Sequence, residues 1–407
     1  MRSLNKRLTI YTLFFIIFLE MFGTFLVYPI LPELFIGDKA IFFYDPQYTN
    51  VAETAYIISL FSWSLGMFFG GPIIGGASDV YGRKRVILLS LACVFGSYFL
   101  SIISILLKNQ IIFFLSRFTI GFFGSCYDIA QAYVADISSE EEKNANMSFM
   151  TLGISVGIIF GPIVAYLSSL ININQTQNVL MPFIFSLIII LTCLICTVFF
   201  LKNNNLGKNK KINFVYILKQ LILTFNILNK GRVKILAISY FLLNLSFSIF
   251  ITTLPVFFQK LYGNSTVVTS KMFIFLGLGF LFSNYAGHYN IFKSLNLKQL
   301  FCYAGVFSGV LPILFLFTDN DLYNFIFIFL YGFFELTSYT TLIIMLSNIM
   351  PSYHLGKAMG GFTSIMCTSF LISSMILATT LSSFIELLIL VSSLCFLLSS
   401  YIVQKFY

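Results

Sequence analysis

Charged residues are scarce in this sequence, and their scarcity excludes most classes of protein. Asp, Glu, Lys and Arg together make up 10% of the 407 residues, whereas an ordinary soluble domain has about 25%. Apolar residues make up 58%, and 50 residues are Phe. Such a chain cannot cover itself with a polar surface, which excludes a cytosolic enzyme, a nucleic-acid-binding protein and a disordered chain.

Residues that bind metals or form disulfides are also few. The two His, His288 and His354, lie far apart in the sequence. All seven Cys fall inside apolar runs, and an odd number in such places does not form a disulfide framework. Cys193 and Cys196 form a C-x-x-C pair with no charged or His neighbour, so small core residues explain it best. We therefore expect no metal and no cofactor.

Long apolar runs dominate the chain. A membrane-spanning helix needs about 20 mostly apolar residues, and twelve runs qualify. They cover residues 8–33, 53–75, 85–107, 110–135, 146–170, 179–201, 234–258, 267–289, 298–318, 322–349, 357–380 and 383–404. The sequence thus predicts an all-α integral membrane protein with twelve transmembrane helices.

The distribution of Lys and Arg predicts the orientation of these spans, because cytoplasmic loops carry most of the positive charge. With the N-terminus inside, 19 of the 24 Lys and Arg fall on cytoplasmic segments and four on external loops. Both termini are then cytoplasmic. A thirteenth apolar stretch, 212–229, has Lys219 and Gln220 at its centre, so we expect a helix along the membrane surface there.

The largest polar stretch divides the spans into two sets of six. We expect an N-terminal six-helix bundle at 1–201, a cytoplasmic linker at 202–233 that contains the interfacial helix, and a C-terminal six-helix bundle at 234–407. Such a layout is typical of transporters built from two repeated halves.

The segment that follows the second span has a distinctive pattern of glycine and charge, GGASDVYGRKRVI. A cytoplasmic turn with basic anchors would explain the basic run but not the spacing of Gly75, Asp79, Gly82, Arg83 and Lys84. This spacing resembles the signature loop of the major facilitator superfamily, although Ala77 and Val80 replace a usual Leu and Arg. The resemblance implies the major facilitator fold and a gating role for this motif, in which the Asp and Arg hold the two halves together.

The fourth span contains two opposite charges. On a continuous helix Arg117, Gly121, Gly124 and Asp128 share one face, and charges of this kind should face the interior of the bundle rather than lipid. A structural ion-pair network is the alternative. The Arg117-x-x-x-Gly121 pattern is similar to one in proton-coupled members of the superfamily, which implies that Arg117 assists proton transfer.

The fifth span carries Gly153, Gly157 and Gly161 at a spacing of four, followed by Pro162. Such a stripe allows two helices to approach closely. The pattern G-x-x-x-G-P resembles the antiporter motif of drug-exporting members, with Ala165 where a last Gly is usual. Gly279, Ser283 and Gly287 in the eighth span form a similar stripe, and the resemblance implies that the two stripes meet across the halves.

Two further carboxyl groups lie in the middle of apolar spans. Glu20 in the first span resembles an acidic residue of the twelve-helix drug:proton antiporters, which include tetracycline and multidrug exporters. A buried carboxyl is a functional hypothesis by default, because the membrane disfavours its charged form. Glu335 in the tenth span shares a face with Tyr331 and Tyr339. It is a second proton site, a substrate contact or a structural carboxyl.

The proton-coupling candidates are thus Glu20, Arg117, Asp128 and Glu335, with Glu20 first. The cavity candidates are Asn244, Ser248 and Thr252 in the seventh span together with Tyr331 and Tyr339. The three residues of the seventh span also fit a simple role in bonding neighbouring helices.

The sequence as a whole favours a secondary transporter that exports small amphipathic molecules in exchange for protons by alternating access. The alternatives are a proton-coupled importer of a nutrient and a dedicated siderophore or metabolite exporter. We expect a monomer in the cytoplasmic membrane of a bacterium, with a small-molecule substrate, protons and the lipid bilayer as its partners, and no nucleic acid. No catalytic constellation occurs in the spans, so an enzyme is not expected.

Overall fold

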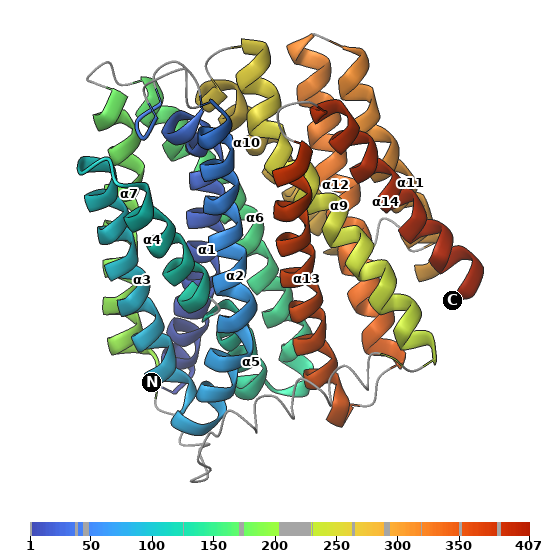
Figure 1. Cartoon of the computed structure of the whole chain (residues 1–407). Helices are drawn as coiled ribbons and strands as arrows, with labels where there is room; N and C mark the ends of the chain where they lie inside the picture. Colours follow the sequence, from blue (N-terminus) through green and yellow to red (C-terminus); the bar gives the residue numbers. More distant parts are fainter. Residues whose placement is uncertain are drawn as a thin grey trace. The chain divides into compact units, whose positions relative to one another are not determined.

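The computed structural model describes residues 2–36, 40–43, 49–124, 126–170, 175–202, 229, 231–262, 265–288, 294–318, 320–349, 352–380 and 384–407. Within these ranges the chain is almost entirely helical and has no β-strand, as the apolar runs predict (Figure 1). A bilayer offers no water to backbone N–H and C=O groups, and a helix satisfies these groups within a single segment.

The chain divides into two compact units, Met1–Ile217 and Leu218–Tyr407. The helices of the first unit are α1 (Arg2–Phe35), α2 (Thr49–Tyr81), α3 (Arg83–Leu106), α4 (Gln110–Gly124), α5 (Cys126–Ile137), α6 (Glu140–Leu170) and α7 (Gln175–Phe200). Those of the second are α9 (Gly231–Tyr262), α10 (Ser265–His288), α11 (Leu297–Leu314) with the short 3₁₀ helix η2 (Phe315–Phe317), α12 (Asp321–Ile349), α13 (Ser352–Thr380) and α14 (Ile385–Phe406). The predicted interfacial helix lies outside the described residues, and the predicted limits of the linker stay a prediction.

Every predicted span overlaps a described helix over most of its length. Ten of the described helices are long and apolar enough to cross a membrane. The span predicted at 110–135 is divided between α4 and α5, and the one predicted at 357–380 lies on α13, which contains the shorter apolar segment Gly361–Leu377. Large apolar side chains are exposed on the outer faces, Phe199 to 75%, as expected of a surface that faces lipid rather than water.

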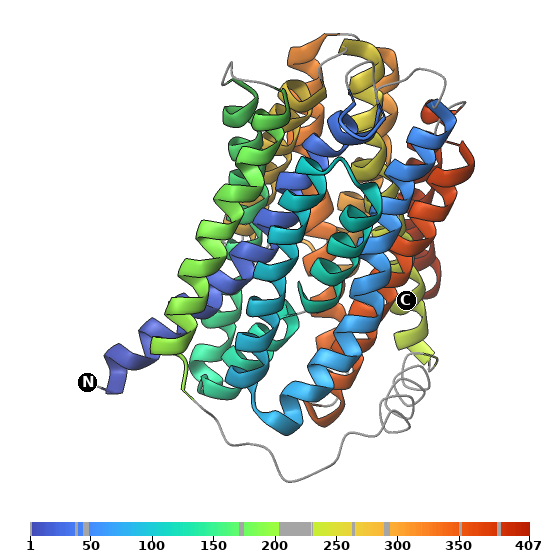
Figure 2. The same cartoon turned by 60° about the vertical axis from the view of Figure 1, so that its left-hand side comes forward.

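The start and the end of each unit lie at the same end of its bundle. In the first unit the Thr9 hydroxyl of α1 donates to the carbonyl of Phe200 at the end of α7, over 2.9 Å, and Figure 2 shows these two helix ends side by side. In the second unit the Arg232 guanidinium of α9 lies 5.8 Å from the centre of the Tyr407 ring, just after α14. Each unit therefore crosses its own bundle an even number of times, as six spans require.

The two units repeat one scheme of helix pairing. In the first unit α1 packs against α6 and α7, α2 against α4, and α3 against α4 and α7. In the second unit α9 packs against α13 and α14, α10 against α12, and α11 against α12 and α14. The pairs correspond in chain order once α4 and α5 are counted as one span.

Candidate functional site

Glu20 lies in the middle of α1 and caps a helix of the same unit. Its Oε2 accepts a hydrogen bond from the backbone N–H of Tyr127, over 3.1 Å. Tyr127 is the second residue of α5, and the first four N–H groups of a helix have no partner within the helix. The positive end of the helix dipole also attracts a carboxylate. The structure thus gives Glu20 a backbone partner that no side-chain pattern in the sequence indicates.

The neighbouring α4 leaves room for this carboxylate. Gly124 is the last residue of α4, and a Cβ atom built on it would lie 3.7 Å from Glu20 Oε1. The sequence predicted one continuous helix over 110–135, and this was wrong, because α4 ends at Gly124 and α5 begins at Cys126. Glycine weakens a helix, and the Glu20 carboxylate supplies a partner for an N–H group that the interruption leaves free.

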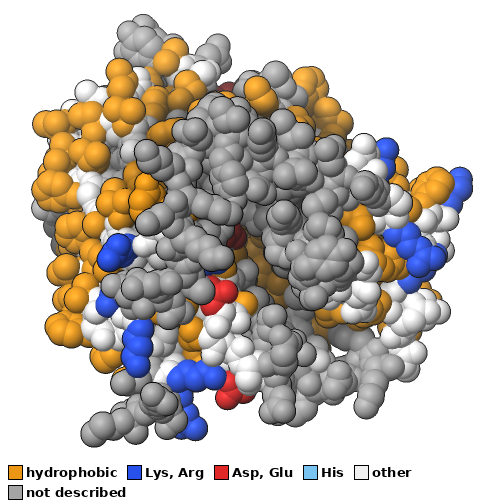
Figure 3. Space-filling model, turned by 90° about the horizontal axis from the view of Figure 1, so that it is seen from below, with side chains coloured by type: hydrophobic (Ala, Val, Ile, Leu, Met, Phe, Trp, Pro, Cys, Tyr) orange, Lys and Arg blue, Asp and Glu red, His pale blue; other side chains and the backbone are white. Residues whose placement is uncertain are grey.

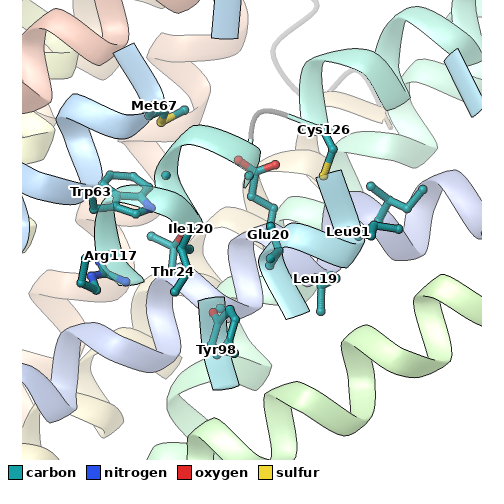
Figure 4. A pocket seen from close by; sticks show the side chains of 15 residues that line it. Leu19, Glu20, Thr24, Trp63, Met67, Leu91, Tyr98, Arg117, Ile120 and Cys126 are labelled. Atoms are coloured by element: carbon teal, nitrogen blue, oxygen red, sulfur yellow. The ribbon is translucent and has the colours of Figure 1, made fainter. Parts of the chain in front are cut away.

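A small cavity of about 30 Å³ lies beside Glu20, which is room for about two water molecules. Its walls come from α1, α2, α3, α4 and α5 of the first unit. They include Glu20, Gly23, Thr24, Trp63, Met67, Tyr98, Arg117, Ile120 and Cys126. Figure 4 shows Arg117 beside Trp63 at one side of the cavity and Glu20 at the other, with Thr24 and Ile120 between them in this view.

Arg117 is enclosed within the unit, as the sequence predicts for a charge in a span. It is 2% exposed, and its guanidinium lies 5.9 Å from the centre of the Trp63 ring. Among the described residues its Nε has no hydrogen-bond partner and its guanidinium forms no ion pair. A buried cation without a counter-ion is costly, and the ring of Trp63 offsets a part of this cost. The alternative of a structural ion-pair network therefore finds no support here.

Asp128 lies near Glu20, whereas the sequence analysis placed it on one helix face with Arg117. It is partly buried in the first turn of α5 and interacts electrostatically with Glu20. The face shared with Arg117 was inferred for a continuous helix, and the interruption after Gly124 removes that basis. The first turn of α5 therefore brings two carboxyl groups together, Glu20 from α1 and Asp128 from α5 itself.

The gating motif lies on helix ends rather than in a long loop. α2 continues to Tyr81, and only Gly82, with a φ of 91°, separates it from α3. Such a φ favours glycine, which explains this residue at the reversal. Beyond Gly82, the Arg83 guanidinium donates to Ser78 Oγ (2.5 Å) and pairs with Asp136 of α5 (3.3 Å between Nε and Oδ2).

The structure describes fewer contacts for Gly75, Asp79 and Lys84 of this motif. Lys84 Nζ donates to the carbonyl of Val198 in α7, over 2.7 Å. Gly75 has open space where a Cβ would lie. The side chain of Asp79 is outside the described part of the structure. The sequence analysis missed Asp136, although an acidic residue at the end of an apolar run is a signal for pairing with a basic motif.

The glycine stripe of α6 packs against α1 of its own unit. A Cβ on Gly157 would lie 2.7 Å from the carbonyl oxygen of Phe18, and one on Gly161 would lie 2.5 Å from that of Phe22. Gly153 likewise meets Phe14, and Pro162 is buried one residue after the stripe. The sequence suggested the eighth span as the partner, whereas these glycines meet α1, the helix that carries Glu20.

The suggested partner stripe also packs within its own unit. A Cβ on Gly279 of α10 would overlap the backbone of Phe329 in α12. The hydroxyl oxygen of Ser283, also in α10, lies 2.9 Å from that of Thr337 in α12. Gly287 has open space where a Cβ would lie. The small residues of α10 therefore serve the contact between α10 and α12.

The polar residues of the seventh span are buried in α9 and bonded. Asn244 Nδ2 donates to the carbonyl of Tyr240 (2.8 Å), Thr252 Oγ1 donates to that of Ser248 (2.7 Å), and the hydroxyls of Ser248 and Ser373 bond α9 to α13. The bond between Ser248 and Ser373 fits the helix-packing alternative, whereas the other two bonds lie within α9 itself. Their role as cavity residues stays a prediction.

Glu335 is buried in α12 and 4% exposed. Tyr331, one turn earlier, is fully buried between the rings of Phe250 and Phe396, and Tyr339, one turn later, lies beside Tyr240. Within the described residues the Tyr331 hydroxyl has no hydrogen-bond partner. This second carboxyl therefore lies inside the second unit, whereas Glu20 belongs to the first.

The sequence is similar to those of known membrane transport proteins. A sequence model of the Major Facilitator Superfamily matches residues 13–374. The class C tetracycline resistance protein of Escherichia coli is 27% identical over 158 residues, which are 38% of this chain and 37% of that protein. Multidrug resistance protein 2 of Bacillus subtilis (strain 168) is 27% identical over 206 residues, 50% of this chain and 46% of that protein. The chain thus spans less than half the length of these two relatives.

Solved structures agree over nearly the whole chain. The human organic anion transporter MFSD10 (TETRAN) superposes with a TM-score of 0.74 at 20% identity, over 98% of this chain and 99% of that chain. A D-xylose-proton symporter superposes with a TM-score of 0.76 at 16% identity, over 98% of this chain and 97% of that chain. At such identities the likeness shows the fold alone, and it confirms the predicted all-α architecture.

Proposed function

Because the chain belongs to the major facilitator superfamily, we propose that it exports small amphipathic molecules in exchange for protons by alternating access. It is a multi-pass membrane protein and a transporter rather than an enzyme. The tetracycline and multidrug resistance proteins to which it is similar favour export, as does the antiporter stripe on α6. The two units are the halves that move against each other in this proposal.

The position of Glu20 is the observation that carries the proton coupling. Its carboxylate caps α5 and adjoins a cavity large enough for water, so it has both a group that stabilises its charge and room for a water molecule beside it. A hydrogen bond to an ionised acceptor is roughly twice as strong as one to a neutral acceptor. Protonation of Glu20 therefore weakens the bond that ties the start of α5 to α1.

This weakening gives the proton a structural consequence. α1 packs against α5 and, through the glycine stripe, against α6. A change in the cap on α5 alters the packing around α1, and a ligand shifts a conformational equilibrium only when it binds the two states differently. In our proposal Arg117 disfavours a second positive charge in the same cavity and so promotes proton release from Glu20. Asp128 is the reserve carboxyl.

The orientation in this proposal places the basic ends of the helices inside the cell. Figure 3 shows Lys and Arg side chains among the described residues at the end seen from below. Lys6 near the start of α1, and Arg83 and Lys84 at the start of α3, are bonded to residues of other helices. Both termini are then cytoplasmic. We place the protein, as a monomer, in the cytoplasmic membrane of a bacterium.

Transport by purified protein in proteoliposomes tests this function. Tetracycline and ethidium serve as probes, with an imposed pH gradient, and wild type is expected to move at least one probe against its concentration gradient. Glu20→Gln keeps the shape of the side chain but cannot ionise, so it should lose uphill transport and retain downhill exchange. Uphill transport at the wild-type rate by Glu20→Gln would remove Glu20 from the coupling role.

The breadth of substrates needs a second experiment. A strain that lacks its native pumps is grown with a panel of inhibitors, with and without this gene. Protection against several unrelated amphipathic compounds supports a multidrug exporter. If the gene protects against none of them and the pH gradient drives no probe in proteoliposomes, the proposal of proton-driven export is wrong.

A further inference from the structure

The two units contain one short sequence in matching places. α4 includes Phe118-Thr-Ile-Gly121-Phe-Phe-Gly124, and α12 includes Phe329-Leu-Tyr-Gly332-Phe-Phe-Glu335. Both segments read Phe-x-x-Gly-Phe-Phe followed by one further residue. Seven residues are too few to reveal a repeat without the structure, but α4 and α12 also hold corresponding places in the pairing scheme of their units.

The contacts of the central glycines fix the register of the two segments. A Cβ on Gly66 of α2 would overlap the carbonyl oxygen of Phe118 and approach the N of Phe122, and one on Gly279 of α10 would do the same with Phe329 and Phe333.

The reverse contacts agree. A Cβ on Gly121 would overlap the carbonyl oxygen of Trp63, three residues before Gly66, and one on Gly332 would lie 2.5 Å from that of Leu276, three residues before Gly279. The crossing of α2 with α4 and that of α10 with α12 are therefore the same crossing in the same register. Gly124 of α4 corresponds to Glu335 of α12, since each lies three residues after the central glycine.

This register places the half-buried carboxyl of Glu20 and the buried carboxyl of Glu335 in equivalent positions. In the first unit the residue at this position is Gly124, and the carboxyl next to it is that of Glu20, which reaches across from α1. In the second unit α12 carries the carboxyl itself, as Glu335. Two different helices thus supply a carboxyl to one place in a repeated architecture.

No described charge neutralises Glu335. α12 packs against α9, α10 and α11, and the basic residues of these helices with described side chains lie in their first two turns: Arg232 and Lys234, Lys271, and Lys298. None of them interacts electrostatically with Glu335, and the titratable group that does is the Tyr331 phenol. Tyr331 is fully buried, and its hydroxyl has no partner among the described residues, so it is free to donate to an ionised Glu335.

We propose that Glu335 is the second proton-binding carboxyl of this transporter, the counterpart in the second unit of Glu20 in the first, so that each transport cycle exchanges two protons. The proposal rests on the proposed function for its role in transport. Proton binding itself converts one carboxylate to a carboxylic acid in each unit, and the Tyr331 hydroxyl donates a hydrogen bond to the carboxylate when the proton has left.

Infrared difference spectroscopy on the purified full chain tests proton binding without any substrate. A pH titration of wild type should show carboxylic acid carbonyl bands that disappear as the pH rises. Glu20→Gln should lack one of these bands and Glu335→Gln a different one, and the double variant should lack both, whereas a band from Asp128, which lies beside Glu20, stays in all three variants and is removed by Asp128→Asn. If Glu335→Gln leaves the wild-type bands unchanged, the second proton site does not exist, whatever the outcome of transport.

A transplanted carboxyl tests the equivalence of the two positions. Glu20→Ala/Gly124→Glu moves the carboxyl from α1 to the position on α4 that corresponds to Glu335, where the built Cβ has no neighbour closer than the Glu20 oxygen that is removed. This variant should regain the first-unit band, and the matched control Glu20→Ala/Gly124→Gln should not. Thermal unfolding shows whether Glu20→Ala/Gly124→Glu is folded. If this variant is folded but lacks the band, the two positions are not equivalent.

The count of protons is measured last. In proteoliposomes the pH gradient that just balances an opposing gradient of the transported probe gives the number of protons per cycle, which we expect to be two in wild type and one in Glu335→Gln. A wild-type ratio of one, together with intact infrared bands, would remove the two-proton cycle. Failure of wild type to respond to pH would instead refute the proposed function, because the infrared result does not depend on transport.

Discussion

The two charged residues that line the cavity of the first unit have different kinds of partner. Glu20 has a backbone N–H at a helix N-terminus, whereas Arg117 has an aromatic ring. The two line one cavity but are not paired. A charge without a counter-ion is costly in a low-dielectric interior, so we propose that these two residues serve transport rather than stability.

Arg117→Met tests this distinction. Removal of one partner from a buried ion pair costs about 3–5 kcal/mol of the free energy of unfolding, but Arg117 has no acidic partner to leave behind. We therefore expect the unfolding temperature of the variant in detergent to stay within about 3 °C of wild type, while proton-driven transport is lost. A large fall in the unfolding temperature would restore the structural ion-pair network that the sequence left open.

The sequence predicts these residues but not their partners. Glu20 and Arg117 stand out because charge is expensive in an apolar span. The cap on α5 depends on the interruption between Gly124 and Cys126, which no Pro marks and which falls inside one apolar run of the sequence. Tyr98 lines the same cavity, and its hydroxyl occupies the space that a side chain on Gly23 would need. In a chain with 22 Tyr nothing distinguished it.

At the scale of helices, close approach is concentrated in a few crossings. The stripe of α6 lies against the backbone of α1 near Glu20, and the two equivalent crossings of α2 with α4 and α10 with α12 each depend on a glycine from both helices. The spacing of the glycines in the sequence predicts that such crossings exist. It cannot predict which helix lies opposite, because the spacing describes the surface of the helix that carries the glycines and not the surface of its partner helix.

Gly157→Ala tests the crossing of α6 with α1. Its new Cβ would lie 2.7 Å from the Cβ of Met21 and from the carbonyl oxygen of Phe18, so the helices must separate. Overpacking of this kind typically costs about 1–3 kcal/mol, and we expect a lower unfolding temperature and slower transport.

The matched control for this change is Gly96→Ala on α3, which has open space. Alanine favours a helix over glycine, so Gly96→Ala should leave the unfolding temperature unchanged or raise it. Equal losses from both changes would show that any added methyl group is harmful, and the specific contact between α6 and α1 would then explain nothing.

The pair of Arg83 and Asp136 links the helix ends at the gating motif. Both side chains are partly exposed, 15% and 31%, and exposed pairs contribute only about 0.2–1 kcal/mol. We expect Asp136→Asn to slow transport several-fold with little change in the unfolding temperature, because an exposed pair contributes little to stability and because the motif to which Arg83 belongs is the gate in our proposal.

The exchange of both charges, Arg83→Asp/Asp136→Arg, is the control for this pair. It restores attraction with the partners reversed, so it should recover a part of the lost rate, whereas Arg83→Asp alone should be slower than Asp136→Asn. If the exchanged variant transports no better than Arg83→Asp, the contact between these two side chains is not what matters at this site.

At the scale of the whole molecule, the repeat of one pairing scheme explains why twelve spans were predictable. The length and hydropathy of the apolar runs predict the spans, and the polar stretch near the middle of the chain suggests two sets of six. The equivalence of the two units was not visible, because most positions of a span are free to exchange one apolar residue for another without loss of packing. Only the glycine crossings restrict the choice of residue enough to leave a shared sequence, Phe-x-x-Gly-Phe-Phe.

The same repeat predicts the topology. Each unit begins and ends at one end of its bundle, so the start of the second unit and the C-terminus lie on the same side of the membrane, and the positive charges place that side in the cytoplasm. Reporter fusions at Lys234 and at Tyr407 should both report the cytoplasm. A fusion at Lys108, in the turn between α3 and α4, should report the outside. An external signal at Tyr407 together with an internal one at Lys234 would mean that the second unit crosses the membrane an odd number of times, and the equivalence of its helices to those of the first unit would then be wrong as well.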